Sequence, residues 1–99
     1  MLGVTPLNVM PISDLIDQVS KICKRNGVQR LDMFGSFATG TATPTSDIDF
    51  VVYGCKDILH LEDELADIDT LRKIDIFEYE SINNKFLKED IEKYGKQIY

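Results

Sequence analysis

The sequence predicts one small domain of the α/β (α+β) class, a small mixed sheet with helices packed mainly on one face. Three observations lead to this prediction. The chain has 99 residues, which is enough for one compact domain spanning residues 1–99 and too few for two. Its apolar share of 43% is ordinary for a globular protein. Apolar stripes at helical spacing alternate with short apolar runs that are typical of strands.

The first ten residues have the character of a loose arm, and the first helix is expected after Pro11. A helix is expected to end at Asn26-Gly27, because glycine readily takes the left-handed conformation that closes a helix. A strand is expected from Val28 to Phe34. The apolar stripe of the helix consists of Ile12, Leu15, Ile16, Val19, Ile22 and Cys23.

The segment "GSFATGTATPTSDIDFVVYG" begins where the first strand ends. The stretch "FATG" is expected to form one short helical turn, and the turn-forming residues of "TGTATPTS" predict a loop. A second strand is expected from Asp47 to Tyr53. Alternation along a strand directs Ile48 to one side and both Asp47 and Asp49 to the other.

The second half of the chain predicts a helix, a strand and a last helix. The second helix is expected from Asp57 to about Asp69, and the third strand in "RKIDIFEYE". Ser81 or Asn83 is expected to cap the last helix, leaving "KQIY" as a tail. The predicted order is therefore α-β-β-α-β-α.

The charge balance, the cysteines and the apolar runs of the sequence indicate which partners and which cellular compartment to expect. Seventeen acidic residues against eleven basic ones argue against a protein that grips nucleic acid through a basic face, and favour a basic partner or acids around metal ions. We expect Cys23 and Cys55 to be reduced and to pack as small apolar residues; this interpretation is preferred to a disulfide or a reactive thiol. No apolar run is long enough to cross a membrane, and the first residues lack the basic region of a signal peptide. A cytoplasmic protein is expected.

Asp47 and Asp49 are predicted to form part of a metal site. Residues two apart on a strand share a side, and two neighbouring carboxylates repel unless a cation neutralises them. Mg²⁺ prefers one or two carboxylates completed by phosphate oxygens and water. Asp75 lies on another predicted strand between Ile74 and Ile76, where an acid has little reason to be for folding alone. The alternative for each acid taken singly is that it simply faces solvent.

Gly35 and Ser36 precede these acids and suit a phosphate. A glycine lets backbone N–H groups approach a phosphate, and a serine adds a hydroxyl donor. The alternative is an ordinary turn between a strand and a loop. Combined with three acids from two strands, the turn predicts phosphoryl-group chemistry with two metal ions.

These stretches resemble the polymerase-beta-like nucleotidyltransferases. The stretch "LDMFGSFATGTATPTSDIDFVVY" is similar to their core motif, and "KIDIFEY" to the strand of their third carboxylate. The stretch "NNKFLKEDIEKYGKQIY" is similar to their last helix and closing tyrosine. In so short a chain, the pattern resembles the minimal nucleotidyltransferase (MNT) family, often the MntA-type antitoxin half of HEPT–MNT toxin–antitoxin pairs.

The resemblance implies a role for each matching residue. Gly35 and Ser36 would bind the triphosphate of ATP or another NTP, and Asp47 and Asp49 would bind two Mg²⁺ ions. Asp75 would bind the catalytic metal and help to activate the acceptor hydroxyl. The implied reaction moves AMP to a hydroxyl of a partner protein, a HEPT-type toxin, and thereby silences it. Nothing in the sequence resembles a second domain that would hold a small-molecule acceptor, so we expect another chain to present the acceptor.

One position departs from the family pattern. Family members often carry a basic residue where this chain has Thr39, which puts nucleotide affinity in question; Lys56, Arg72 and Lys73 are candidates to compensate. Two alternatives therefore stay open. The chain could neutralise a partner toxin by occlusion with little catalysis, or it could transfer the nucleotide to a small-molecule acceptor. An RNA end is the weakest choice of acceptor because the chain is acidic. Whether the chain forms hetero- or homo-oligomers also stays open.

Overall fold

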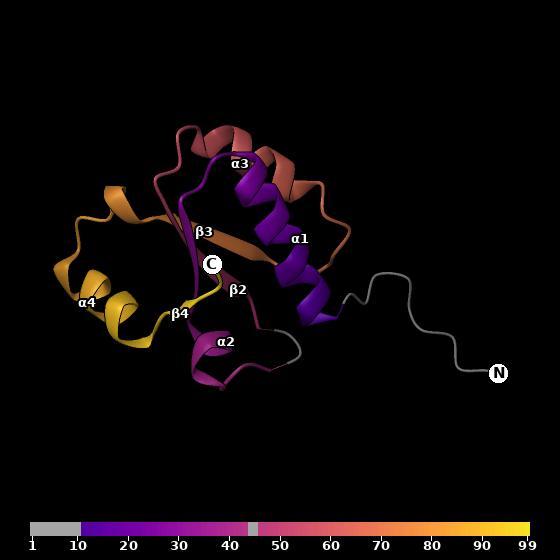
Figure 1. Ribbon diagram of the computed structural model, residues 1–99. Coiled ribbons are helices and arrows are strands. Elements are labelled where there is room, and N and C mark those ends of the chain that lie inside the picture. The colour runs from indigo at the N-terminus through magenta and orange to yellow at the C-terminus, as the bar shows by residue number, and fades with distance from the viewer. Residues whose placement is uncertain (1–10, 44–45) are drawn as a thin grey trace.

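The computed structural model describes residues 11–43 and 46–99, so the arm expected over residues 1–10 lies outside the described part of the chain. Four α-helices, one 3-10 helix and four strands make up the described residues (Figure 1). In chain order they are α1 (Ile12–Arg25), β1 (Arg30–Phe34), α2 (Ser36–Thr39), β2 (Ile48–Tyr53), α3 (Ile58–Ala66), β3 (Ile74–Glu78), the 3-10 helix η1 (Tyr79–Ser81), α4 (Lys85–Tyr94) and β4 (Lys96–Gln97).

The four strands form one mixed sheet in the order β3-β2-β1-β4. β1 is antiparallel to both β2 and β4, whereas β2 and β3 are parallel. The parallel pair is possible because α3 carries the chain back to the end of the sheet where β2 began. The predicted α/β fold with a small mixed sheet is thus confirmed, but the expected tail "KQIY" contributes an edge strand instead of hanging free.

The main core lies between one face of the sheet and the helices α1 and α3. Figure 1 shows the two helices side by side over the sheet. Strand alternation directs Leu31, Ile48 and Phe50 into this layer, where all three are fully buried. The helices contribute the buried residues that the apolar stripes predicted, among them Leu15, Val19, Cys23, Leu61 and Leu65.

The opposite face of the sheet carries polar side chains and is covered only in part. Val51 and Ile91 of α4 are buried, but neither belongs to the main core. Tyr79, the first residue of η1, donates a hydrogen bond to Glu92 of α4 (2.7 Å), and the ring centroids of Tyr53 and Tyr79 lie 4.6 Å apart. α4 therefore belongs to this second face, which leaves the end of the sheet near α2 without a covering long helix (Figure 1).

Several element boundaries differ from the sequence prediction. β2 begins at Ile48, one residue late, and α3 already ends at Ala66. β1 begins at Arg30 because the Val28 N–H is used to close α1, bonding to Cys23 O. Asp57 caps α3 and lies outside it. Asn84, and neither Ser81 nor Asn83, caps α4 by accepting from two backbone N–H groups. In residues 11–43 and 46–99, no helix has the length and apolar character needed to span a bilayer.

Candidate active site

Asp49 and Asp75 lie side by side on adjacent strands. They are direct partners in the parallel register of β2 and β3, so their side chains leave the sheet on the same face. This face is opposite to the main core, because the flanking residues Ile48 and Phe50 are buried in that core. The structure therefore brings together two of the three predicted acids, from strands that are separated in sequence by α3.

The electrostatics of Asp49 reflect this closeness. Burial raises the pKa of the Asp49 carboxyl above its ordinary value, and the charge of Asp75 and a hydrogen bond with the Asp75 carboxyl raise it further. Asp47 adds to the rise in the pKa, whereas Lys73 opposes it. Two carboxyl groups in contact on a half-buried surface disfavour double ionisation. A cation placed between them would relieve this repulsion.

Gly35 packs directly against Asp49. The residue has φ 74° and ψ −150°, a region of backbone space that is almost exclusive to glycine. A Cβ at this position would lie 2.5 Å from Asp49 Oδ2, closer than any real contact. The register pairs Phe34 with Asp49, so the chain turns away from β1 at the point where it passes the acid. The predicted turn and the predicted acid are therefore neighbours in space.

Ser36 and Asp47 lie at the border of this site. Ser36 is the first residue of α2 and is partly exposed, which agrees with the short helical turn expected after Gly35. Asp47 is exposed and lies one residue before β2 begins. Within residues 11–43 and 46–99, no group of three His, Cys, Asp or Glu side chains is close enough to hold a metal ion. As placed, the acids form a close pair with a third carboxylate beside it.

Two basic residues, Arg72 and Lys73, lie in the segment before β3. Lys73 Nζ lies 3.6 Å from Asp75 Oδ1 in a largely exposed ion pair. The guanidinium carbon of Arg72 lies 4.9 Å from the centroid of the Phe37 ring in α2, and Arg72 Nη1 donates to Ser46 O. Thr39, the position that departs from the family pattern, donates its hydroxyl to Gly35 O at 3.3 Å.

Asp32 is an acid on the same face that the sequence analysis did not single out. It is 1% exposed and accepts hydrogen bonds from Arg30 Nε (2.9 Å), Arg30 Nη2 (3.1 Å) and the Tyr53 hydroxyl (3.0 Å). With this set of donors, Asp32 holds the second face together. An acid between Leu31 and Met33 in an apolar strand was the signal that could have drawn attention to it.

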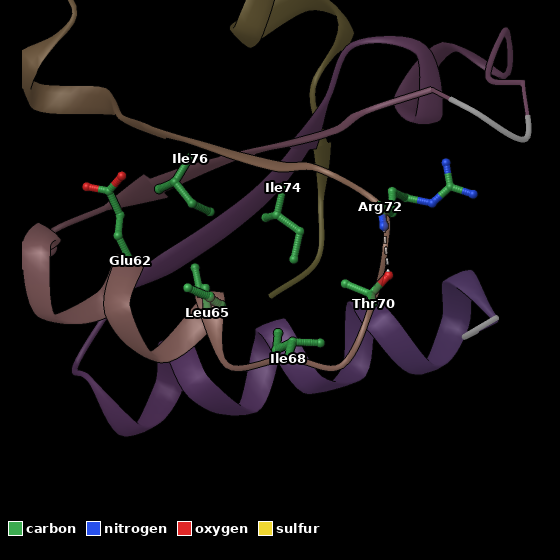
Figure 2. A pocket seen from close by; sticks show the side chains of 8 residues that line it. Glu62, Leu65, Ile68, Thr70, Arg72, Ile74 and Ile76 are labelled. Carbon is green, nitrogen blue, oxygen red and sulfur yellow. Dashed lines mark hydrogen bonds between the residues drawn. The ribbon is translucent and has the colours of Figure 1, made fainter. Parts of the chain in front are cut away.

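A cavity of about 180 Å³ lies between α3 and β3, and Arg72 is among the residues that line it (Figure 2). Its apolar lining includes Leu65, Ile68, Ile74 and Ile76, so it is continuous with the main core. Asp75 alternates with the two isoleucines and faces the opposite way. The cavity is smaller than common ligand pockets and brings together no acids from β2, so it is not the candidate site.

The donor set of the second face suits Mg²⁺. Carboxylate oxygens are the ligands that this ion prefers, and it needs only one or two of them when phosphate oxygens and water complete its shell. Asp49 and Asp75 are the residues placed to hold such an ion, with Asp47 beside them. The backbone at Gly35 borders the pair, and the absence of a side chain is what lets the Asp49 carboxylate lie against it.

Comparisons with known proteins agree with this geometry. Residues 17–99 match the family model described as "Polymerase beta, Nucleotidyltransferase". A curated relative from Methanocaldococcus jannaschii, named "Putative protein adenylyltransferase MJ0128", is 34% identical over 91 residues, covering 86% of this chain and 92% of the relative.

Solved structures share the fold. A toxin–antitoxin crystal structure with AMP-PNP superposes with a TM-score of 0.68 at 27% identity, covering 85% of this chain and 72% of that chain. A structure described as a "putative minimal nucleotidyltransferase" superposes with a TM-score of 0.61 at 26% identity, covering 89% and 91% of the two chains.

Proposed function

Since this chain belongs to the polymerase beta nucleotidyltransferase family and is a nucleotidyltransferase, we propose that it transfers AMP from ATP to a hydroxyl group of a partner protein. The partner that we propose is a HEPT-type toxin, which the transfer would silence. The relative named as a protein adenylyltransferase supports a protein acceptor. The toxin–antitoxin neighbour, crystallised with AMP-PNP, supports an antitoxin role and an adenine nucleotide.

The observation that carries the proposal is the contact between Asp49 and Asp75. The carboxyl groups come from two parallel strands and meet on the face that α1 and α3 leave open. Burial and then the neighbouring charge of Asp75 raise the pKa of Asp49, so holding both carboxylates ionised gives the folded chain no advantage in the absence of a cation. Such an arrangement is typical of a site that binds a metal and a phosphorylated substrate.

The proposed roles of the residues follow from their positions. Asp47, Asp49 and Asp75 would hold Mg²⁺, and bound Mg²⁺ would neutralise phosphate charge and lower the pKa of the acceptor hydroxyl. The backbone of Gly35 and the hydroxyl of Ser36 would contact the triphosphate. Asp75, at the start of the edge strand β3, would accept the proton of the acceptor hydroxyl.

The chemical step is a substitution at the α-phosphorus. The acceptor oxygen forms a bond to this phosphorus, and the bond from the phosphorus to the bridging oxygen of the β-phosphate breaks. Pyrophosphate leaves with the electron pair of that bond, and the acceptor hydroxyl loses its proton to the carboxylate. The product is AMP joined to the acceptor through a phosphodiester.

A transfer assay tests this function. The purified chain is incubated with ATP labelled at the α-phosphate, Mg²⁺ and the protein encoded beside it as the candidate toxin, and label on that protein is measured. We expect labelling by the native chain and its loss in Asp49→Asn and Asp75→Asn. Asp63→Asn makes the same change in charge at an exposed position of α3 and serves as the control that keeps activity. Equal labelling by native chain and Asp75→Asn would contradict the proposal.

Neutralisation by occlusion is the second candidate. Two observations favour it: Thr39 stands where a basic residue would aid nucleotide binding, and the described residues form no three-ligand group. The double variant Asp47→Ala, Asp49→Ala separates the two functions in cells that express the toxin. Full protection by this variant supports occlusion, and lost protection by a folded variant supports AMP transfer.

A further inference from the structure

We propose that Arg72 binds the phosphates of the incoming nucleotide, bridging the turn at Gly35-Ser36 and the segment that leads into Asp47. This inference rests on the proposed nucleotidyl transfer and adds a residue to its site. The negative charges of a nucleotide and those of the aspartates repel each other. A nucleoside triphosphate would enter a face that carries Asp32, Asp49 and Asp75, with Asp47 beside them, and α2, which borders the turn, contains no basic residue. A cationic side chain from another element is therefore needed beside any bound metal.

The position of Arg72 meets this need. Its guanidinium carbon lies 4.9 Å from the centroid of the ring of Phe37, the residue that follows Ser36. Its Nη1 donates to Ser46 O, immediately before Asp47. Figure 2 shows the head of Arg72 turned away from the apolar side chains of the cavity. Arg72 thus contacts the residue after Ser36 and the residue before Asp47, two positions that border the candidate site.

The other basic candidates are placed differently. Lys73 faces Asp75 at 3.6 Å and offsets the charge of that acid. Lys56 follows the far end of β2, whereas Asp49 is near its start. Thr39 offers only a hydroxyl, which is hydrogen-bonded to Gly35 O and within 3.0 Å of the Thr41 hydroxyl.

The chemistry of arginine fits the role. The guanidinium is always charged and presents its donors in a planar fork that matches two phosphate oxygens. The contact with the Phe37 ring restricts the side chain before a ligand arrives, so less entropy is lost on binding. Loss of a charge-assisted hydrogen bond of this kind lowers affinity by about tenfold or more.

The experiment measures ATP affinity by calorimetry in the presence of Mg²⁺ for four forms of the full chain. They are the native chain, Arg72→Met, the control Arg25→Met, and the double variant Arg72→Met, Thr39→Arg. Arg25 is an exposed arginine of α1 that pairs with Glu64 of α3, so its replacement removes the same charge away from the site. Thermal unfolding shows which variants are folded, and Arg72→Gln replaces Arg72→Met if the latter is not.

We expect Arg72→Met to weaken ATP binding by about tenfold or more, Arg25→Met to leave it unchanged, and Thr39→Arg to restore most of the loss. Restoration is the result that a merely structural arginine would not give. Affinity within twofold of the native value for Arg72→Met, or a loss that Thr39→Arg does not recover, overturns the inference. If Arg72→Met binds ATP and labels the toxin as the native chain does, the proposed function stands without it. Absence of ATP binding by the native chain overturns both.

Discussion

Replacing Gly35 with alanine tests whether the turn and the acid pair form one site. The backbone at Gly35 (φ 74°, ψ −150°) costs a residue with a side chain about 1–3 kcal/mol in strain. The new Cβ would also lie 2.5 Å from Asp49 Oδ2, so the carboxylate must move away from its place beside Asp75. We expect about 2 kcal/mol of lost stability, which corresponds to a fall of roughly 8–16 °C in Tm for a domain of this size. Displacement of the acid should also abolish AMP transfer.

Gly27 provides the matched control. Its φ is 76°, and a Cβ there would meet nothing within 4 Å. Gly27→Ala therefore introduces backbone strain of about 1–2 kcal/mol without a clash. Thermal unfolding and the transfer assay, both run below the Tm of each variant, separate strain from displacement. A folded Gly35→Ala chain that transfers AMP as well as Gly27→Ala would refute the view that this turn forms part of the site.

Three further predictions concern stability. The pKa of Asp49 is raised in the folded state, so this carboxyl favours folding most below its unfolded pKa and loses that contribution as the pH rises through its folded pKa. Without metal, Asp49→Asn should therefore resist urea better than the native chain at pH 7, and this advantage should vanish toward pH 4. Equal stability of the two chains at pH 7 would contradict this. Asn84→Ala removes the cap of α4 and should cost about 1 kcal/mol, or roughly 4–8 °C in Tm, whereas Asn84→Asp should retain the cap. Asp32→Ala deprives Arg30 and Tyr53 of their acceptor and should cost about 1–3 kcal/mol in urea unfolding; a change below about 0.5 kcal/mol would count against this.

The placement of Asp49 and Asp75 on one face was predictable because strand alternation is a strong local rule. Once Ile48, Phe50, Ile74 and Ile76 enter the core, the intervening acids must face the other way. Whether the two acids meet was not predictable from this rule, because it depends on which residues pair across the strands. The parallel register that aligns them depends on how α3 packs and returns the chain.

Asp32 and β4 show why the remaining features escaped prediction. Asp32 and Asp75 each lie between two apolar residues, but only the structure shows that Arg30 and Tyr53 donate hydrogen bonds to the oxygens of Asp32. β4 consists of Lys96 and Gln97, which are exposed and joined to the sheet through backbone pairing with β1. The two exposed residues of β4 leave no pattern of hydrophobicity in the sequence, and the apolar neighbours of Asp32 do not reveal its hydrogen-bond partners.

Because β3 is an edge strand of the sheet, local unfolding of β3 is enough to separate the acid pair. β3 pairs with β2 alone, and residues at such borders detach at a lower free energy than the interior strands do. A chain that has released β3 still contains every carboxylate, but it no longer brings two of them together. Proteolytic nicking between α3 and β3, or capture of the released edge by another chain, would therefore remove the metal-binding pair while most of the domain stays folded.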